Sequence, residues 1–398
     1  PVSFRNDIII RGGAPNENRF YIDGVEIPTI NHFTTQGSSG GPVGLINVDF
    51  IKEVDFYSGA FPASRGNTLS SVFEFKQKDG NPDSLRTSLT LGSSDFATTL
   101  EGPITKKTTF IASYRLSYLQ GLFKLLGLPF LPSYQDFQFK LKTRFNPKHE
   151  LTLLGLGAID KSKLNFGAEN TEDNLYLLAN LPENNQENYT LGAVYKNYRQ
   201  KGFSTVVLSR NYLNNRADKF RDNNESDLKT LDYASSETEN KLRFENTSKE
   251  GVYRINFGAG LESAEYNTRT LQYLPGGLDQ YQSHLTFQKY GFFAQLSAPY
   301  FEDKLNLSLG MRFDGNNFAT QMHNPLKTFS PRFSASYYFN DKISFNFNSG
   351  IYYQLPSYTL LGYRSGADNA LANKHVDYIK SAQLVAGLEY NTLKNTRF

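Results

Sequence analysis

The stretch Asp136-Phe137-Gln138-Phe139-Lys140-Leu141-Lys142-Thr143-Arg144-Phe145 alternates between polar or charged residues and mostly apolar ones. Side chains of a β-strand point to opposite faces with a period of two residues, so one face of this strand is apolar and the other is polar. The same alternation recurs down the chain, for example over residues 253–261 and 305–313. The pattern predicts a mainly β protein, a large antiparallel sheet with roughly fourteen strands from Leu85 onward.

The connections between these strands alternate in length. Tight turns are expected at residues 103–107, 146–150, 200–202, 248–251, 301–304 and 339–342. Longer polar connections are expected at residues 117–134, 160–188, 214–233, 267–283, 315–328 and 356–376. A soluble sandwich has no reason to place every long loop on one side, whereas an outer-membrane barrel has short periplasmic turns and long outer loops. The sequence therefore favours a transmembrane antiparallel β-barrel with its apolar face toward lipid and its polar face toward a wide lumen.

Strand length and composition agree with this interpretation. Several strands, such as residues 253–268, exceed the roughly 9–11 residues that cross a bilayer, so they are expected to project beyond the outer side. The formal net charge of +3 is too small for a dedicated nucleic-acid binder, and the absence of cysteine excludes a disulfide framework within these 398 residues. No stretch approaches the roughly 20 apolar residues of a membrane-spanning helix.

Residues 1–79 do not follow the hairpin rhythm, and they are expected to form a small α+β domain before a barrel at residues 80–398. The expected elements are a strand at 7–13, a hairpin at 20–27 across Asp23-Gly24, a helical turn passing into a strand at 48–57, and a strand at 72–76. An Asp-Gly pair between short apolar runs is a strong hairpin signal.

Two segments of this region, RGGAPNENRFYIDGVEIP (residues 11–28) and INVDFIKEVDFYSGAFPASRG (46–66), resemble the plug domain of TonB-dependent outer-membrane receptors. SPRFSASYYF (330–339) and YYQLP (352–356) resemble the barrel of that family, so the resemblance covers essentially the whole chain. The sequence departs from the family at Leu69-Ser70-Ser71-Val72, where relatives often have paired glycines. The residues that carry the plug resemblance are Ile9, Arg11, Gly12, Gly13, Tyr21, Asp23, Gly24, Val25, Ile27, Pro28, Ile51, Val54, Tyr57, Gly59 and Gly66.

The resemblance implies plug-gated, TonB-dependent transport of a scarce ligand across the outer membrane of a Gram-negative bacterium. The implied partners are the TonB energy-coupling complex, outer-membrane lipid, a surface lipoprotein, and a ligand such as a siderophore, glycan or peptide. No cofactor is expected. Family members close with about 22 strands, wide enough to hold a plug. The chain is therefore expected to be a fragment that lacks about eight strands, the early plug and the TonB-contacting segment. A turn is expected at residues 391–397, with Phe398 opening the next strand.

Two groups of residues are candidate sites. Asn31, His32, Phe33 and Thr34 follow the Asp-Gly hairpin, and they are expected to form an outward-facing plug loop that meets the ligand, with simple plug packing as the alternative. Arg11 and Glu26 are charges in a domain that a barrel would enclose. A buried charge needs a partner, so counter-charges are expected on the barrel wall.

Other functions are weaker alternatives. The five histidines are scattered without metal-ligand spacing, and no nucleophile motif is present, so no catalytic residue and no metal site is assigned and an enzyme is disfavoured. A passive barrel for adhesion or protein docking, with a non-transporting plug, remains the main competitor. The apolar segment at residues 118–131 is expected to pack as a loop core, with a short amphipathic helix over the barrel mouth or a contact with another protein as the alternatives.

Overall fold

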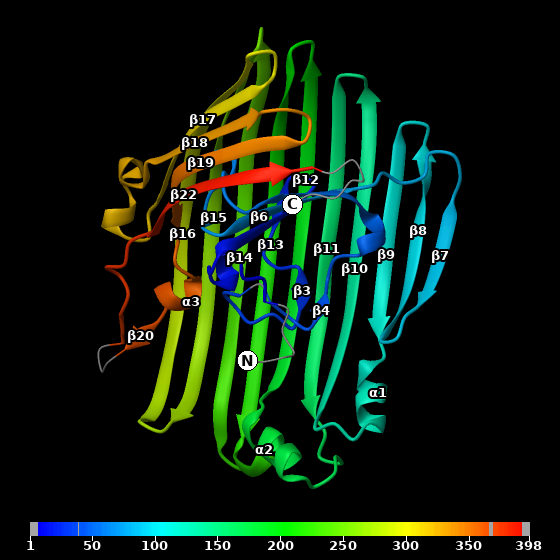
Figure 1. Cartoon of the computed structure of the whole chain (residues 1–398). Helices are drawn as coiled ribbons and strands as arrows, with labels where there is room; N and C mark the ends of the chain where they lie inside the picture. Colours follow the sequence, from blue (N-terminus) through cyan, green and yellow to red (C-terminus); the bar gives the residue numbers. More distant parts are fainter. Residues whose placement is uncertain (1–6, 39, 366–368, 392–398) are drawn as a thin grey trace.

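A curved fourteen-stranded antiparallel sheet dominates the computed structural model, which describes residues 7–38, 40–365 and 369–391. Neighbours in the chain are neighbours in the sheet, from β7 at one edge to β22 at the other, so the expected strand number and the mainly β class are confirmed. Within the described residues β7 and β22 do not pair, so the sheet is an open wall around the N-terminal segment (Figure 1). The strands are β7 Arg86–Leu91, β8 Asp95–Thr105, β9 Thr108–Ser117, β10 Phe130–Asn146, β11 His149–Leu164, β12 Glu183–Arg199, β13 Gly202–Phe220, β14 Lys229–Glu250, β15 Tyr253–Leu274, β16 Gly277–Tyr300, β17 Leu305–Asn316, β18 Ser330–Tyr338, β19 Ile343–Gln354 and β22 Ile379–Tyr390.

The two ends of the wall differ as expected. One end carries only the predicted tight turns, while the helices α1 Leu119–Leu125, α2 Glu172–Asn180 and α3 Tyr358–Leu361 and the short strands β20 Arg364–Ser365 and β21 Ala370–Leu371 lie in the longer connections (Figure 1). The helix α1 confirms the short helix considered for residues 118–131. No helix in the described ranges is long and apolar enough to cross a membrane.

Two sequence expectations are wrong. Residues 267–283 are not a long loop, because β15 continues to Leu274 and β16 begins at Gly277, directly across a two-residue turn. The alternation predicted to end at Thr268 continues through Thr270, whose side chain is also buried. Residues 7–10 are not a strand; the carbonyl of Ile8 is held by the side-chain amide of Asn18 at 2.7 Å instead of by a sheet ladder. The expected turn at 391–397 lies almost wholly outside the described residues.

The N-terminal segment, residues 7–79, contains a four-stranded sheet in the order β2-β1-β6-β5. Its strands are β1 Asn18–Ile22, β2 Val25–Ile27, β5 Ile51–Tyr57 and β6 Ser71–Gln77, and the short pair β3 Asn31–His32 and β4 Val43–Gly44 lies beside it. The predicted hairpin is confirmed, with positive φ at Asp23 (48°) and Gly24 (90°), as a type I′ turn requires. The helical turn that passes into a strand is also confirmed, as a 3-10 turn at Val48–Phe50 followed by β5.

The core of this segment is shared with the wall. Phe20, Ile22, Val25 and Ile27 pack against inward-facing apolar side chains of β11 to β13, namely Leu154, Leu156, Val194 and Val207. The fit is close, since a Cβ at Gly192 of β12 would lie only 2.4 Å from a methyl group of Val25. The inner face of the wall carries many buried polar side chains, and it is apolar in three places: at this core, around Tyr352 of β19, and where β15 and β16 meet the long connections.

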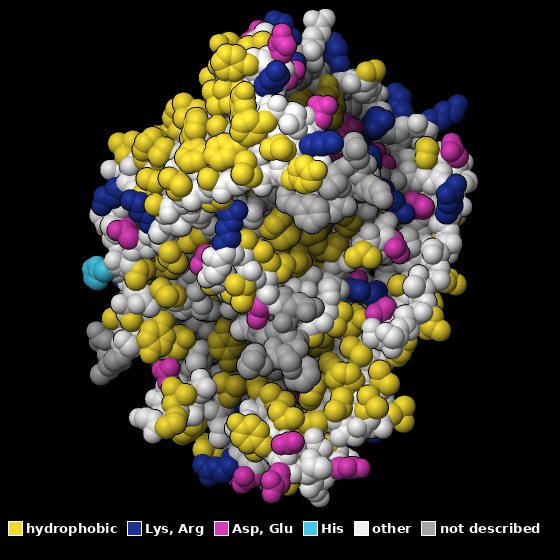
Figure 2. All heavy atoms as spheres, viewed as in Figure 1, with side chains coloured by type: hydrophobic (Ala, Val, Ile, Leu, Met, Phe, Trp, Pro, Cys, Tyr) yellow, Lys and Arg dark blue, Asp and Glu magenta, His cyan; other side chains and the backbone are white. Residues whose placement is uncertain are grey.

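The outer face of the wall is apolar. In β10, Phe137 and Phe145 are 42% and 47% exposed, while Asp136, Gln138 and Lys140 on the opposite face are at most 4% exposed. Figure 2 shows apolar side chains gathered over the region of β17, β18, β19 and β22, where Leu309, Leu384 and Leu388 are exposed. An exposed apolar belt outside and buried polar groups inside are the inverse of a soluble protein, and they match a wall that faces lipid.

A charge introduced into this belt is expected to destabilise the protein according to its depth. Phe257 is 44% exposed and follows the first residue of β15 by four positions, whereas Leu274 is 46% exposed at the tip of the β15–β16 hairpin. In urea titrations of the full-length protein in phospholipid vesicles, Phe257→Arg should lower the free energy of unfolding by about 2–4 kcal/mol. Leu274→Arg should change it by less than about 0.5 kcal/mol. Equal losses in both variants would contradict the lipid-facing assignment.

Candidate functional site: the N-terminal segment in the wall and the outer cavity

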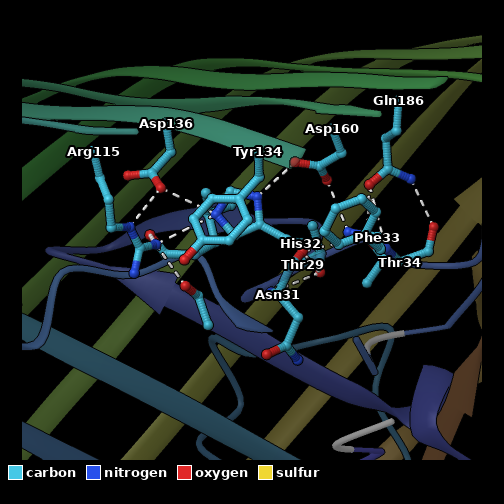
Figure 3. A network of polar contacts seen from close by, with 12 residues as sticks. Thr29, Asn31, His32, Phe33, Thr34, Arg115, Tyr134, Asp136, Asp160 and Gln186 are labelled. Atoms are coloured by element: carbon cyan, nitrogen blue, oxygen red, sulfur yellow. Dashed lines mark hydrogen bonds and ion pairs between the residues drawn. The ribbon is translucent and has the colours of Figure 1, made fainter. Parts of the chain in front are cut away.

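The loop after the first hairpin is attached to the wall through His32, whose side chain is completely buried. Its Nδ1 lies 2.6 Å from Asp160 of β11, and its Nε2 lies 3.1 Å from Asp136 of β10. The same Asp136 carboxylate accepts a hydrogen bond from Arg115 Nε of β9 at 2.7 Å, and the ring of Tyr134 packs against His32 at a centroid distance of 4.3 Å and a tilt of 34° (Figure 3). Three neighbouring strands therefore hold one imidazole.

The charges of this cluster balance when His32 is protonated. Burial alone would lower the pKa of His32, but the hydrogen bonds to Asp136 and Asp160 outweigh burial and hold the pKa above its ordinary value. The imidazolium and the Arg115 guanidinium then neutralise two carboxylates. A neutral His32 would leave one negative charge uncompensated in a buried site, which is strongly unfavourable.

The two residues after His32 are fixed through their backbone. Phe33, at a positive φ of 54°, donates its N–H to Asp160 Oδ2 at 2.8 Å. The side-chain amide of Gln186 of β12 pairs with the backbone of Thr34. Its Nε2 donates to the Thr34 carbonyl at 2.6 Å, and its Oε1 accepts from the Thr34 N–H at 3.3 Å. Paired donor and acceptor contacts of this kind fix the loop as a sheet neighbour would.

The four residues predicted to meet the ligand divide into two pairs. Asn31 and His32 are buried in β3, and His32 contacts the wall. Phe33 and Thr34 line a cavity on the side of the long connections. Ligand contact by these residues stays a prediction, and Phe33 and Thr34 are the two placed to make it.

The two predicted contact charges also differ. Glu26 lies 3.1 Å from Lys241 of β14 and 3.7 Å from Arg19. Lys241 in turn lies 2.8 Å from Glu239, and Lys289 of β16 bridges Glu239 and Glu262. Burial alone would raise the pKa of Glu26, but Lys241 and Arg19 outweigh it and lower the pKa. Arg11 lies at the surface, and no carboxylate among the described residues pairs with it.

Other anchors were not found from the sequence. Arg65 pairs with Glu74 of its own segment at 2.6 Å and with Glu245 of β14 at 2.7 Å, and it lies over the Tyr21 ring. Arg332 of β18 donates from Nη1 to the carbonyls of Phe61, Pro62 and Arg65 at 2.6–3.1 Å. The alternation predicts that Arg332 lies on the inward face of its strand, but it does not predict which residues the side chain contacts.

A cavity, called the outer cavity below, lies between the long connections and the loop that contains His32, the His32 loop. Its volume is about 1180 Å³. Its walls come from residues 33–36 and 42–43, from α1 and α2, and from the ends of β10 to β13 nearest these helices. The loop that is fastened to the wall therefore forms part of the floor of this cavity.

The fold and this arrangement define an outer-membrane β-barrel of the receptor class. The family model described as TonB dependent receptor-like, beta-barrel matches residues 133–398. The chain therefore belongs to the TonB-dependent receptor family, and its location is the outer membrane of a Gram-negative bacterium. The comparison with curated proteins returns no match.

Solved receptors share the fold. A variant of the ferric enterobactin receptor from Pseudomonas aeruginosa superposes with a TM-score of 0.70 at 15% identity, over 96% of this chain and 62% of the receptor. A siderophore receptor from Acinetobacter baumannii gives 0.66 at 14% identity, over 96% and 62%. The copper transporter OprC gives 0.70 at 14% identity, over 97% and 63%. This chain thus spans less than two thirds of the length of these receptors, and at such identity the likeness concerns the fold alone.

Proposed function

We propose that the protein imports a scarce ligand across the outer membrane, and that residues 1–79 are a plug that gates the barrel begun by residues 80–398. The observation that carries the proposal is the way the N-terminal segment fills the lumen. It is held there by two apolar clusters shared with the wall and by side-chain contacts to β9, β10, β11, β12, β14, β16, β17, β18, β19 and β22. It would block the passage of a closed barrel, and no disulfide ties it to the wall, because the 398 residues contain no cysteine.

The character of these contacts supports gating. Most of them are hydrogen bonds and ion pairs, which water can replace once the lumen is hydrated. A pull on the segment by the TonB complex would therefore exchange protein contacts for water contacts and open a path. The ligand, supplied directly or by a surface lipoprotein, would bind in the outer cavity, with Phe33 and Thr34 on its floor.

Uptake measured with and without TonB tests this proposal. Cells that express the full-length protein as their only receptor are given labelled ferric enterobactin, copper, cobalamin, a maltodextrin and an apolar peptide. We expect at least one of these to accumulate, and its accumulation to fall at least about tenfold when TonB is deleted. Equal uptake in both strains would contradict coupled transport and favour a passive barrel.

A further inference from the structure

The walls of the outer cavity are largely apolar. The side chains that line it include Phe33, Leu119, Phe123, Phe130, Leu164 and Leu177, contributed by the His32 loop, α1, β10, β11 and α2. At about 1180 Å³ the cavity is somewhat larger than the roughly 300–1,000 Å³ usual for small-molecule sites. It therefore has room for a ligand with a substantial apolar body.

The polar groups of the floor are already engaged with one another. The two oxygens of Asp160 accept from His32 and from the Phe33 N–H. The amide of Gln186 is paired with Thr34. Gln36 donates to Glu237 at 2.5 Å and accepts from Tyr233 at 2.6 Å. An apolar ligand would cover these groups without leaving them unpaired, so their burial would carry little desolvation penalty.

Few charged side chains line the cavity, which also favours an uncharged ligand. Asp160 and Arg216 are the only acidic or basic side chains among the lining residues that the structure describes. Asp160 is 1% exposed and lies 2.6 Å from His32 Nδ1, so Arg216 is the one exposed charged side chain of the lining. A multiply charged anion requires several arginines or lysines placed around it. The walls supplied by this chain do not provide such a set.

We propose that the outer cavity selects an uncharged ligand with a large apolar body over a multiply charged metal chelate. The proposal rests on the proposed function only in treating this cavity as the ligand site. Recognition comes from shape and from removal of apolar surface from water, with the amides at the edge orienting the ligand.

Two pairs of variants test where such a ligand binds. Leu177 and Leu175 both lie in α2, but Leu177 lines the cavity and Leu175 is 51% exposed away from it. In α1 the same contrast holds between Phe123 in the lining and Leu125, which is 87% exposed.

The probe is N-phenyl-1-naphthylamine, an uncharged dye that fluoresces in apolar surroundings. It is titrated onto the full-length protein in lipid nanodiscs, with empty nanodiscs subtracted.

We expect Leu177→Asn and Phe123→Asn each to weaken dye binding about tenfold, because each removes a large apolar contact. Leu175→Asn and Leu125→Asn should change it less than about twofold. The second pair keeps the test valid if one helix does not tolerate its substitution. Equal affinities in the lining and control variants would overturn the proposal.

The charge preference is tested with a matched dye. Anilinonaphthalene sulfonate has the same ring system with one negative charge, and it should bind at least about tenfold more weakly than the uncharged dye. Ferric enterobactin, a trianion, should not displace the uncharged dye. Equal binding of both dyes, or displacement by ferric enterobactin, would overturn the proposal. These measurements contain no TonB, so a failure of energy coupling would leave their outcome unchanged.

Discussion

His32→Ala is expected to destabilise the attachment of the N-terminal segment by about 3–5 kcal/mol, the usual effect of removing one partner from a buried ion pair. The substitution leaves Asp136 and Asp160 buried, with Arg115 as the remaining cation beside Asp136. It also removes the link between the loop and two strands. Residues 29–46, which contain this loop and the β3–β4 pair, should then open far more often.

The same attachment should weaken as the pH rises. The pKa of His32 is raised in the folded protein, so its contribution is fully present below the ordinary value of 6.5 and declines as the pH rises through the folded-state pKa. The His32→Ala variant lacks this titration, so its loop should show a flatter pH dependence above neutrality.

Hydrogen exchange of residues 29–46 as a function of pH measures both effects. After correction for intrinsic exchange, the wild-type loop should lose protection on the alkaline side, and His32→Ala should lack protection throughout. His284, which is exposed on β16, provides the control, since His284→Ala should leave the loop unchanged. A wild-type loop whose protection rises with pH would refute the imidazolium assignment.

Most of the fold could be predicted because period-two alternation is a local property. The residues 136–145 already separate Phe137 and Phe145 from Asp136, Gln138 and Lys140, and the structure places the two sets on opposite faces. The errors occurred where local signals are weak. The β15–β16 hairpin runs past residue 268 through polar residues that look like a loop, although Pro275-Gly276 marks its turn. In residues 7–10 an apolar run finds no neighbouring strand, and a side chain holds it instead.

The type of contact at the site could be predicted from the sequence, but the partner residues could not. The need of Glu26 for a counter-charge followed from enclosure, but its partner Lys241 is more than two hundred residues away in the chain. His32 was selected as a residue of the loop, while its carboxylate partners come from two strands whose alternation fixes only that Asp136 and Asp160 face inward. Which inward residue meets which plug residue depends on the register of the whole segment in the lumen, and no local pattern encodes that register.

A reversible tether between the N-terminal segment and the wall is expected to abolish transport without abolishing ligand binding. Gln138 Oε1 of β10 accepts from the Asn47 N–H at 3.0 Å, away from the lining of the outer cavity. The Gln138 Nε2 has no partner within the described residues, so replacing this side chain removes only its hydrogen bond to Asn47. Because the 398 residues contain no cysteine, Asn47→Cys with Gln138→Cys introduces the only two thiols among them.

The control tether joins two residues of the wall. Thr108 of β9 and Thr143 of β10 have hydroxyl oxygens 3.1 Å apart near a short turn, so Thr108→Cys with Thr143→Cys cross-links strands that are already paired. This tether leaves the N-terminal segment free. It should therefore have no effect on uptake if gating requires movement of that segment alone.

The most direct measurement is TonB-dependent uptake of the accumulated ligand in cells whose receptor carries either cysteine pair, before and after treatment with a short, reducible bis-methanethiosulfonate reagent. We predict that bridging positions 47 and 138 reduces uptake at least about tenfold, that reductant restores it, and that bridging positions 108 and 143 changes nothing. Undiminished uptake through a receptor whose positions 47 and 138 are fully bridged would contradict a gate formed by the N-terminal segment.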